Sequence, residues 1–217
     1  MSVKLGSYQL HSPAIGSAVT IEFFRDVDEE HAMRVHSSWR PILIERHNLA
    51  MLRHRQLNKP TSADWLALQQ EYGVPDAKWQ WPDLLTEVRG KTTHASFCIE
   101  AKGEVQAMMR VDLTKRCRLS GQAGQHLAYV DRIAVAPWNR RQIQDPPFLA
   151  GLGKILLGVA VSLSVDEGWD GRTGLHSLVQ AEGFYRRSGM SDHGIDQDHE
   201  GLRYFEFSAS DAHKFLG

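Results

Sequence analysis

Two glycines and a lysine precede an apolar run in the segment FLAGLGKILLG, residues 148–158. Glycine lets a phosphate approach the backbone closely, and a helix N-terminus offers unpaired N–H groups with about half a positive charge. The segment could therefore bind a phosphate, or it could simply begin a helix. Two stricter phosphate motifs do not fit, because GxxxxGK[ST] would need glycine at Phe148 and GxGxxG would need glycine at Leu156.

An acidic residue, Asp131, interrupts the otherwise apolar segment YVDRIAVAP. A carboxylate within an apolar strand is costly unless it has a partner. Strand alternation predicts that Asp131 shares a face with Tyr129, Ile133 and Val135. The residue is therefore a functional candidate, although a structural partner close to Arg132 or a role as a loop cap would also explain it.

Eleven histidines raise the question of a metal site. His47 and His54 could share a helix face, but no HExxH motif occurs and no cysteine–histidine cluster has zinc spacing. We therefore predict no metal. The two cysteines, Cys98 and Cys117, are too few for a disulfide framework and favour a reducing compartment.

The composition is that of an ordinary globular protein, with 42% hydrophobic and 24% charged residues in a chain of 217. Lys and Arg number 25 and Asp and Glu 26, and this balance argues against broad attraction to nucleic acid or to an anionic membrane. The start, MSVKLGSYQL, lacks the apolar region of a secretory signal, and no apolar run is long enough to span a membrane. We therefore expect a cytoplasmic protein with a single domain over residues 1–217.

The elements that must hold these residues alternate between strands and helices, which favours an α/β fold. The segment 26–57 is expected to form two helices, because Pro41 should break it. Thr61 and Asp64 have the spacing of a capping box, and Lys102-Gly103 is typical of a hairpin turn. Strands are expected at 19–24, 126–137, 172–178 and 202–207, and helices at 61–73, 152–167 and 179–190, with an acidic loop from 191 to 201.

The helix that begins in the glycine segment carries one apolar stripe with the period of a helix packed on a sheet. The stripe consists of Leu152, Ile155, Leu156, Val159, Ala160 and Leu163.

Three segments between about His126 and Phe207 resemble, in the correct order, the GNAT acyltransferase superfamily, which uses acetyl-coenzyme A. YVDRIAVAP resembles the family's central strand ending in V-x-P, and FLAGLGKILL resembles its [QR]-x-x-G-x-[GA] pyrophosphate loop and helix. LHSLVQAEGFYRRSGM resembles the following strand and the A-x-x-x-Y-x-x-x-G-[FM] helix. The resemblance implies a mixed, mostly antiparallel sheet flanked by helices. It assigns a strand, enlarged helices and a hairpin to 18–125, and the coenzyme-binding core to 126–207.

The resemblance also implies an acetyl-coenzyme A-dependent N-acetyltransferase. Backbone amides of residues 149–154 would hold the pyrophosphate, the backbone of 133–135 would pair with the pantetheine, and Tyr185 would protonate the leaving sulfur. Asp131 stands where some family members carry a glutamate that relays the amine's proton, so it is the candidate base. The implied coenzyme-binding residues are Ile133, Ala134, Val135, Arg140, Arg141, Leu149, Ala150, Gly151, Leu152, Gly153, Lys154, Ser177 and Phe184.

The chain departs from the family pattern in two places. Phe148 replaces the usual Gln or Arg at the head of the glycine motif, and residues 138–147 are inserted before it. We expect Arg140 or Arg141 to supply the missing positive charge, with a solvated pair of loop arginines as the other interpretation.

The expected acceptor is a primary amine on a small molecule or a protein, and the acidic loop at 192–200 could attract it if cationic. We expect no membrane partner and no nucleic acid, and whether the chain forms a homodimer stays open. The alternative function is a non-catalytic GNAT-like module that binds an acyl-coenzyme A as a sensor or interaction domain.

Overall fold

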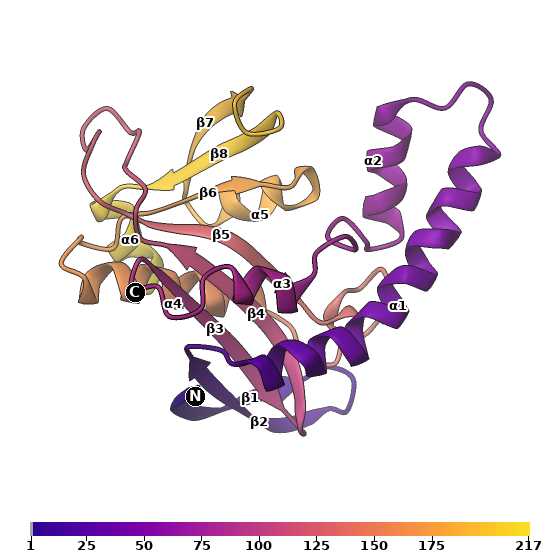
Figure 1. The fold of residues 1–217 in the computed structure, drawn as a ribbon, viewed down its shortest axis with the longest axis horizontal. Helices are drawn as coiled ribbons and strands as arrows, with labels where there is room; N and C mark the ends of the chain where they lie inside the picture. Colours follow the sequence, from indigo (N-terminus) through magenta and orange to yellow (C-terminus); the bar gives the residue numbers. More distant parts are fainter. Residues whose placement is uncertain (1) are drawn as a thin grey trace. The chain divides into compact units, whose positions relative to one another are not determined.

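A computed structural model describes residues 2–217 and has the predicted α/β class. One mostly antiparallel sheet contains eight strands in the hydrogen-bonded order β1-β2-β3-β4-β5-β6-β8-β7 (Figure 1). The strands are β1 (Val3–Ser12), β2 (Ser17–Arg25), β3 (His94–Ala101), β4 (Glu104–Asp112), β5 (Ala128–Val135), β6 (Thr173–Ser177), β7 (Ser191–Asp196) and β8 (Leu202–Phe207). The helices are α1 (Glu29–Arg55), α2 (Ser62–Glu71), α3 (Trp81–Thr86), α4 (Leu152–Asp166), α5 (Glu182–Arg187) and α6 (Ala209–Leu216).

The backbone forms two compact units. The first contains residues 2–89, 97–108 and 134–152, and the second contains 90–96, 109–133 and 153–217. Strands β3, β4 and β5 contribute residues to both. The single domain expected over 1–217 stays a prediction. Within the described residues, no helix is both long enough and apolar enough to cross a membrane.

In the first unit, α1 and α2 lie beside one another and α1 also packs against α3 (Figure 1). Asp28 caps α1 by accepting a hydrogen bond from the amide of His31, and the predicted capping box of Thr61 and Asp64 is present at α2. The core of this unit is formed by α1 side chains such as Trp39 and Leu43 together with Trp81, Cys98 and Met108.

Two expectations for the first unit were wrong. Pro41 does not break α1, which runs unbroken through it. The proline is exposed, and the buried Trp39 and Leu43 on either side hold the helix against the core, so packing outweighs the lost backbone hydrogen bond. The sequence also gave no sign of β1, because most of its side chains are exposed and only its pairing with β2 defines it.

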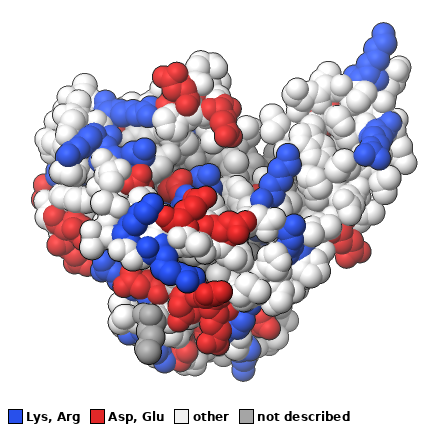
Figure 2. All heavy atoms as spheres, in the orientation of Figure 1, with Lys and Arg blue, Asp and Glu red and all other residues white. Residues whose placement is uncertain are grey.

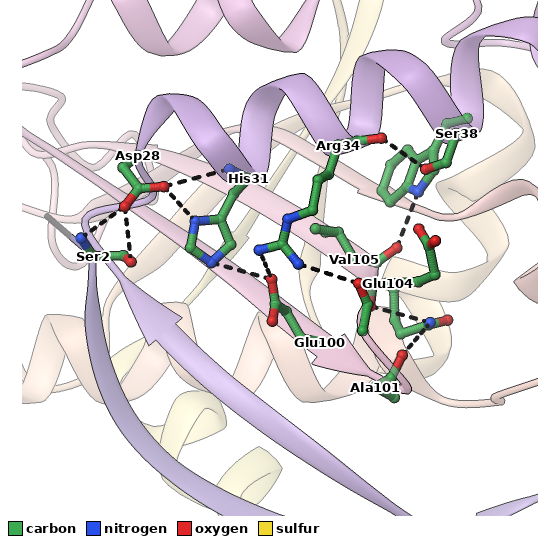
Figure 3. A network of polar contacts seen from close by, with 12 residues as sticks. Ser2, Asp28, His31, Arg34, Ser38, Glu100, Ala101, Glu104 and Val105 are labelled. Carbon is green, nitrogen blue, oxygen red and sulfur yellow. Dashed lines mark hydrogen bonds and ion pairs between the residues drawn. The ribbon is translucent and has the colours of Figure 1, made fainter.

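A buried polar network joins the start of α1 to β3 (Figure 3). His31 Nδ1 lies 2.6 Å from Asp28 Oδ1, and its Nε2 lies 3.2 Å from Glu100 Oε1. Arg34 pairs with the same Glu100 carboxylate, while the amide and hydroxyl of Ser2 donate to Asp28. Both imidazole nitrogens therefore face carboxylates.

In the second unit, β6 pairs in parallel with β5 and antiparallel with β8, and β8 pairs with β7. Of the predicted α4 stripe, Leu152, Leu156, Ala160 and Leu163 are buried, whereas Ile155 and Val159 are only half-buried. Leu157 and Val161 are buried as well, so the buried face is wider than one stripe. The acidic loop expected from 191 to 201 was wrong, because residues 191–196 form β7 against β8.

Candidate functional site

Strands β5 and β6 are paired at only three residue pairs. Their pairing runs from Ala128–Thr173 to Val130–Leu175, yet β5 continues to Val135 and β6 to Ser177. No further β5–β6 pair is present among residues 2–217. We call this point the fork. Backbone groups of β5 beyond the fork can pair with an extended ligand as though it were another strand.

The strand backbone expected to meet pantetheine is only partly available. The carbonyl of Val135 accepts two hydrogen bonds from Arg140, at 3.0 Å from Nε and 2.7 Å from Nη2. A carbonyl oxygen has two lone pairs, so this one is fully engaged. Ile133 and Ala134 are therefore the better candidates for pairing.

The N-terminus of α4 is open at the glycine segment. Gly151 has a φ of +80°, and a side chain added there would meet nothing within 4 Å. Ala150, Gly151 and Lys154 are exposed, so their amides can be approached. The amide of Leu149, by contrast, donates to Asn139 Oδ1 at 2.8 Å. An anion at this helix end would thus meet residues 150–154, and Leu149 is removed from the predicted set.

The insertion 138–147 places Arg140 in a structural role. Its side chain is buried, and all five of its N–H donors are used, by both carboxylate oxygens of Asp76, by the carbonyl of Gly73 and twice by Val135. Arg140 therefore has no open donor for a pyrophosphate in this structure, and its role in coenzyme binding stays a prediction. Arg141 is exposed and forms no ion pair among the described residues, so it stays a candidate.

Tyr185 lies on α5, buried against the rings of Phe184 and Phe205 at centroid distances of 5.0 and 5.7 Å. Burial raises the pKa of its phenol well above the ordinary value, so the hydroxyl stays protonated. No described residue forms a hydrogen bond with that hydroxyl.

The ring of Phe184 on α5 would lie 4.0 Å from a Cβ atom added at Gly153, which is an ordinary contact distance. Ser177 is buried, and its hydroxyl donates to the carbonyl of Leu178 at 2.8 Å.

Asp131 has two cationic partners. It accepts hydrogen bonds from Arg110 Nε at 2.5 Å and from Arg132 Nη1 at 2.7 Å. These ion pairs offset the free energy that it costs to bury the Asp131 carboxylate in this strand. Its oxygens are engaged before any substrate arrives.

Two acids of the β7–β8 region, Asp192 and Asp196, have arginine partners as well. Asp192 pairs with Arg186 and Arg203. Burial raises its pKa, but hydrogen bonds from Arg203, the Gly194 amide and Arg186 lower it further, to about 2. Acidic and basic side chains are also interspersed on the face shown in Figure 2. The expected acidic attraction for a cationic amine has no clear basis here.

A polar cluster that the sequence did not indicate lies beside the fork. The Tyr129 hydroxyl lies 2.6 Å from His176 Nδ1, and His176 Nε2 lies 2.9 Å from Asp196 Oδ2. Arg118 also pairs with Asp196, and the ring of His199 stacks on His176 at 4.0 Å. The sequence pattern that could have indicated this cluster is the presence of two polar residues, Tyr129 and His176, within strands β5 and β6, whose residues are all buried or half-buried.

Two residue groups have the side chains of a metal site, but neither has the geometry. His31, Cys98 and Glu100 converge in the first unit, yet both nitrogens of His31 already face carboxylates. In the second group, His176 and His199 lie at an interplanar angle of 3°, so their nitrogen lone pairs run parallel and do not converge on one ion. Arg118 also neutralises the carboxylate between them.

No protein-family model matches the chain, and no curated protein matches it significantly. Solved structures do match. The GNAT domain of S. lividans PAT superposes with a TM-score of 0.50 at 12% identity, covering 93% of this chain and 96% of that one. A protein from Desulfovibrio desulfuricans assigned to the GNAT family has a TM-score of 0.50 at 14% identity, covering 87% and 99%.

An uncharacterized protein from Bacillus halodurans superposes with a TM-score of 0.54 at 8% identity, over 99% of this chain and 96% of that one. At these identities the likeness concerns the fold alone. The chain has the GNAT fold, as the sequence resemblance implied.

Proposed function

With the GNAT fold as the premise, we propose that this protein transfers an acetyl group from acetyl-coenzyme A to a primary amine of a small molecule or a protein. The observation that carries the proposal is the fork, where β5 has no β6 partner beyond Val130. An extended pantetheine arm would pair with Ile133 and Ala134, and its thioester would lie at the fork.

The pyrophosphate would be held at the N-terminus of α4. Amides of Ala150 to Lys154 would donate to it, the helix dipole would favour its charge, and the Lys154 and Arg141 side chains would add positive charge. Ser177 and Phe184 would line the pantetheine path on β6 and α5. These roles rest on the exposure of residues 150 and 151 and on the positive φ of Gly151.

The reaction needs a nucleophilic nitrogen and a protonated leaving group. The neutral amine attacks the thioester carbon, the carbon–sulfur bond breaks, and the departing sulfur takes the proton of the Tyr185 hydroxyl. Because burial raises the pKa of this phenol, it is protonated at neutral pH and has a proton to donate. The base proposed at Asp131 would have to act from within its ion pairs with Arg110 and Arg132.

Calorimetric titration with acetyl-coenzyme A tests the binding site. We expect Gly151→Val to abolish binding, because the β-branched side chain fills the space above the amides and disfavours a φ of +80°. Gly16→Val, in the β1–β2 turn at a φ of +66°, carries similar backbone strain and should bind normally. Equal binding by the two variants would contradict the proposed site.

Release of free thiol from acetyl-coenzyme A in the presence of an amine panel tests the activity. Turnover with any amine supports the transferase, and Tyr185→Phe should lower kcat by about 10²-fold or more while coenzyme binding is kept. Binding without turnover on every amine would instead favour the non-catalytic module.

A further inference from the structure

Three hydrogen-bonded side chains cross from β5 to β6 and on to β7, and the function proposed above does not use them. Tyr129, His176 and Asp196 are joined by contacts of 2.6 and 2.9 Å. The His176 side chain is only 4% exposed, whereas Tyr129 is half-buried and forms the β5 end of this cluster. A substrate at the fork would therefore meet this cluster at the Tyr129 hydroxyl.

The direction of the hydrogen bonds follows from the charge of Asp196. Hydrogen bonds from Arg118 and His176 lower the pKa of this carboxyl, so it is ionised and can only accept. His176 Nε2 must then carry a proton and donate it. The other nitrogen, Nδ1, keeps a lone pair, and the Tyr129 hydroxyl donates to that lone pair.

The groups around His176 keep it neutral. Burial lowers its pKa below 6.5; Asp196 raises it, while His199 and Arg118 lower it further. Tyr204 on β8 is the remaining titratable neighbour, with its ring 4.9 Å from the imidazole. Burial, with Asp131 nearby, raises the pKa of Tyr129 to about 12, so the phenol is protonated while the imidazole can accept.

These three hydrogen-bonded side chains lie at the fork. Tyr129 pairs with Gly174, one step before the last β5–β6 pair, and His176 follows Leu175 of that last pair. His176 and Tyr204 are partners in the β6–β8 register, whereas the next residue, Phe205, contacts Tyr185. Neighbouring residues of a strand point to opposite faces of the sheet. The Tyr129–His176–Asp196 cluster and Tyr185 therefore lie on opposite faces of this sheet.

We propose that Tyr129, His176 and Asp196 form a proton relay that receives the proton of the attacking amine. The inference rests on the proposed acetyl transfer. It gives that reaction a proton acceptor on one face of the fork and a proton donor, Tyr185, on the other. Tyr129 is then a catalytic residue, His176 stores the proton, and Asp196 is a positioning residue.

The proton balance is simple. As the carbon–nitrogen bond forms, the nitrogen becomes positively charged and acidic. One of its N–H bonds breaks and the proton joins the oxygen of Tyr129, while the original proton of Tyr129 moves to His176 Nδ1. The phenol is neutral before and after, and the imidazolium between Tyr129 and Asp196 later loses its proton to water.

The kinetic test compares Tyr129→Phe, His176→Gln and Asp196→Asn with His213→Gln, which removes an exposed histidine of α6. With the fastest amine of the panel, we expect the first two variants to lose about 10²–10³-fold in kcat at neutral pH, with unchanged affinity for acetyl-coenzyme A. The wild-type rate should fall as pH drops through the pKa of His176, below 6.5, and this acid limb should be absent in His176→Gln. The control should match the wild type.

A kcat within about threefold of the wild type in both variants, with turnover otherwise normal, would overturn the relay and leave the transferase intact. Absence of turnover with every amine would overturn both proposals. A loss of coenzyme binding equal to the loss of kcat would assign these residues to binding and so contradict the relay.

Heteronuclear NMR of the histidine side chains gives a readout besides activity. We expect His176 to carry its proton on Nε2, to titrate below 6.5, and to titrate lower still in Asp196→Asn because the carboxylate no longer raises its pKa. A proton on Nδ1, or a pKa at or above the ordinary value, would overturn the relay even in an active enzyme.

Discussion

The two units each bury a histidine beside an aspartate and an arginine, yet the two arrangements differ in what the second imidazole nitrogen meets. In the first unit, His31 has a carboxylate at each nitrogen, from Asp28 and Glu100. In the second, His176 has the carboxylate of Asp196 at one nitrogen and a phenol, Tyr129, at the other. His31 thus faces an acceptor at both nitrogens, whereas Nδ1 of His176 faces a hydroxyl that can donate to it.

This difference separates a structural cluster from one that can move a proton. A histidine held between two carboxylates adds stability, because removing it takes one hydrogen-bond partner from each of two acids. A histidine that accepts from a hydroxyl can take a proton from it without a change in heavy-atom positions. Residue type alone does not distinguish the two cases.

The largest expected effect concerns the neighbouring arginines of the insertion. Arg140→Ala should lower the free energy of unfolding by about 3–5 kcal/mol, because it leaves the buried Asp76 carboxylate unpaired. Arg141→Ala, at an exposed side chain, should change it by less than about 0.5 kcal/mol while weakening coenzyme binding. Urea unfolding and calorimetry check the pair, and equal stability losses would refute the distinction.

The next effect compares the two histidines directly. His31→Gln should cost about 2 kcal/mol of unfolding free energy because it removes contacts to two carboxylates, whereas His176→Gln should cost about 1 kcal/mol because it removes a contact to one. The kinetic effects should be reversed, with normal kcat per folded molecule only for His31→Gln. If His176→Gln proved the more destabilising, the cluster at the fork would be chiefly structural.

A smaller effect is expected at Gly174, between β5 and β8. A methyl group there would lie 2.6 Å from the Tyr204 hydroxyl, which donates to the buried Glu206 at 2.6 Å. Gly174→Ala should therefore destabilise the protein by about 1–3 kcal/mol, as overpacking does. Gly121→Ala, where a methyl group meets nothing within 4 Å, is the matched control and should be close to neutral in thermal unfolding.

The smallest effect is on the pH dependence of stability. The pKa of His176 is lowered from 6.5, so the unfolded chain binds the proton first and stability should fall as pH drops below about 6.5. Burial raises the pKa of Asp28, but hydrogen bonds from His31 and Ser2 lower it more, so its contribution is present above about pH 4 and lost at lower pH.

Denaturant unfolding as a function of pH should therefore resolve two windows. His176→Gln should reduce the slope of the mildly acidic window and leave the other, while Asp28→Asn should reduce the slope of the strongly acidic one only. A single window that moves with either substitution would mean that the two clusters titrate together.

Local signals carried much of the fold. We predicted the capping box at Thr61, the turn at Lys102-Gly103 and the end of the α4 helix before Gly168, because each depends on a few adjacent residues. Lys102 and Gly103 both have a positive φ, as the turn requires. Strand β1 and helix α6 were missed, since their short or exposed segments become regular only by pairing with β2 or packing on β8. The ion pair of Arg140 was missed because Asp76, its partner, lies 64 positions away.

By itself, the sequence determined the α/β class, most of the central strands and helices, and the glycine entry to α4, because periodicity and local backbone preference act over a few residues. The tertiary structure alone decided which polar groups are already engaged and which retain a lone pair or an open donor. Hydrogen bonds join atoms that are near in space, and Tyr129 and His176 meet across 47 positions only because β5 and β6 pair.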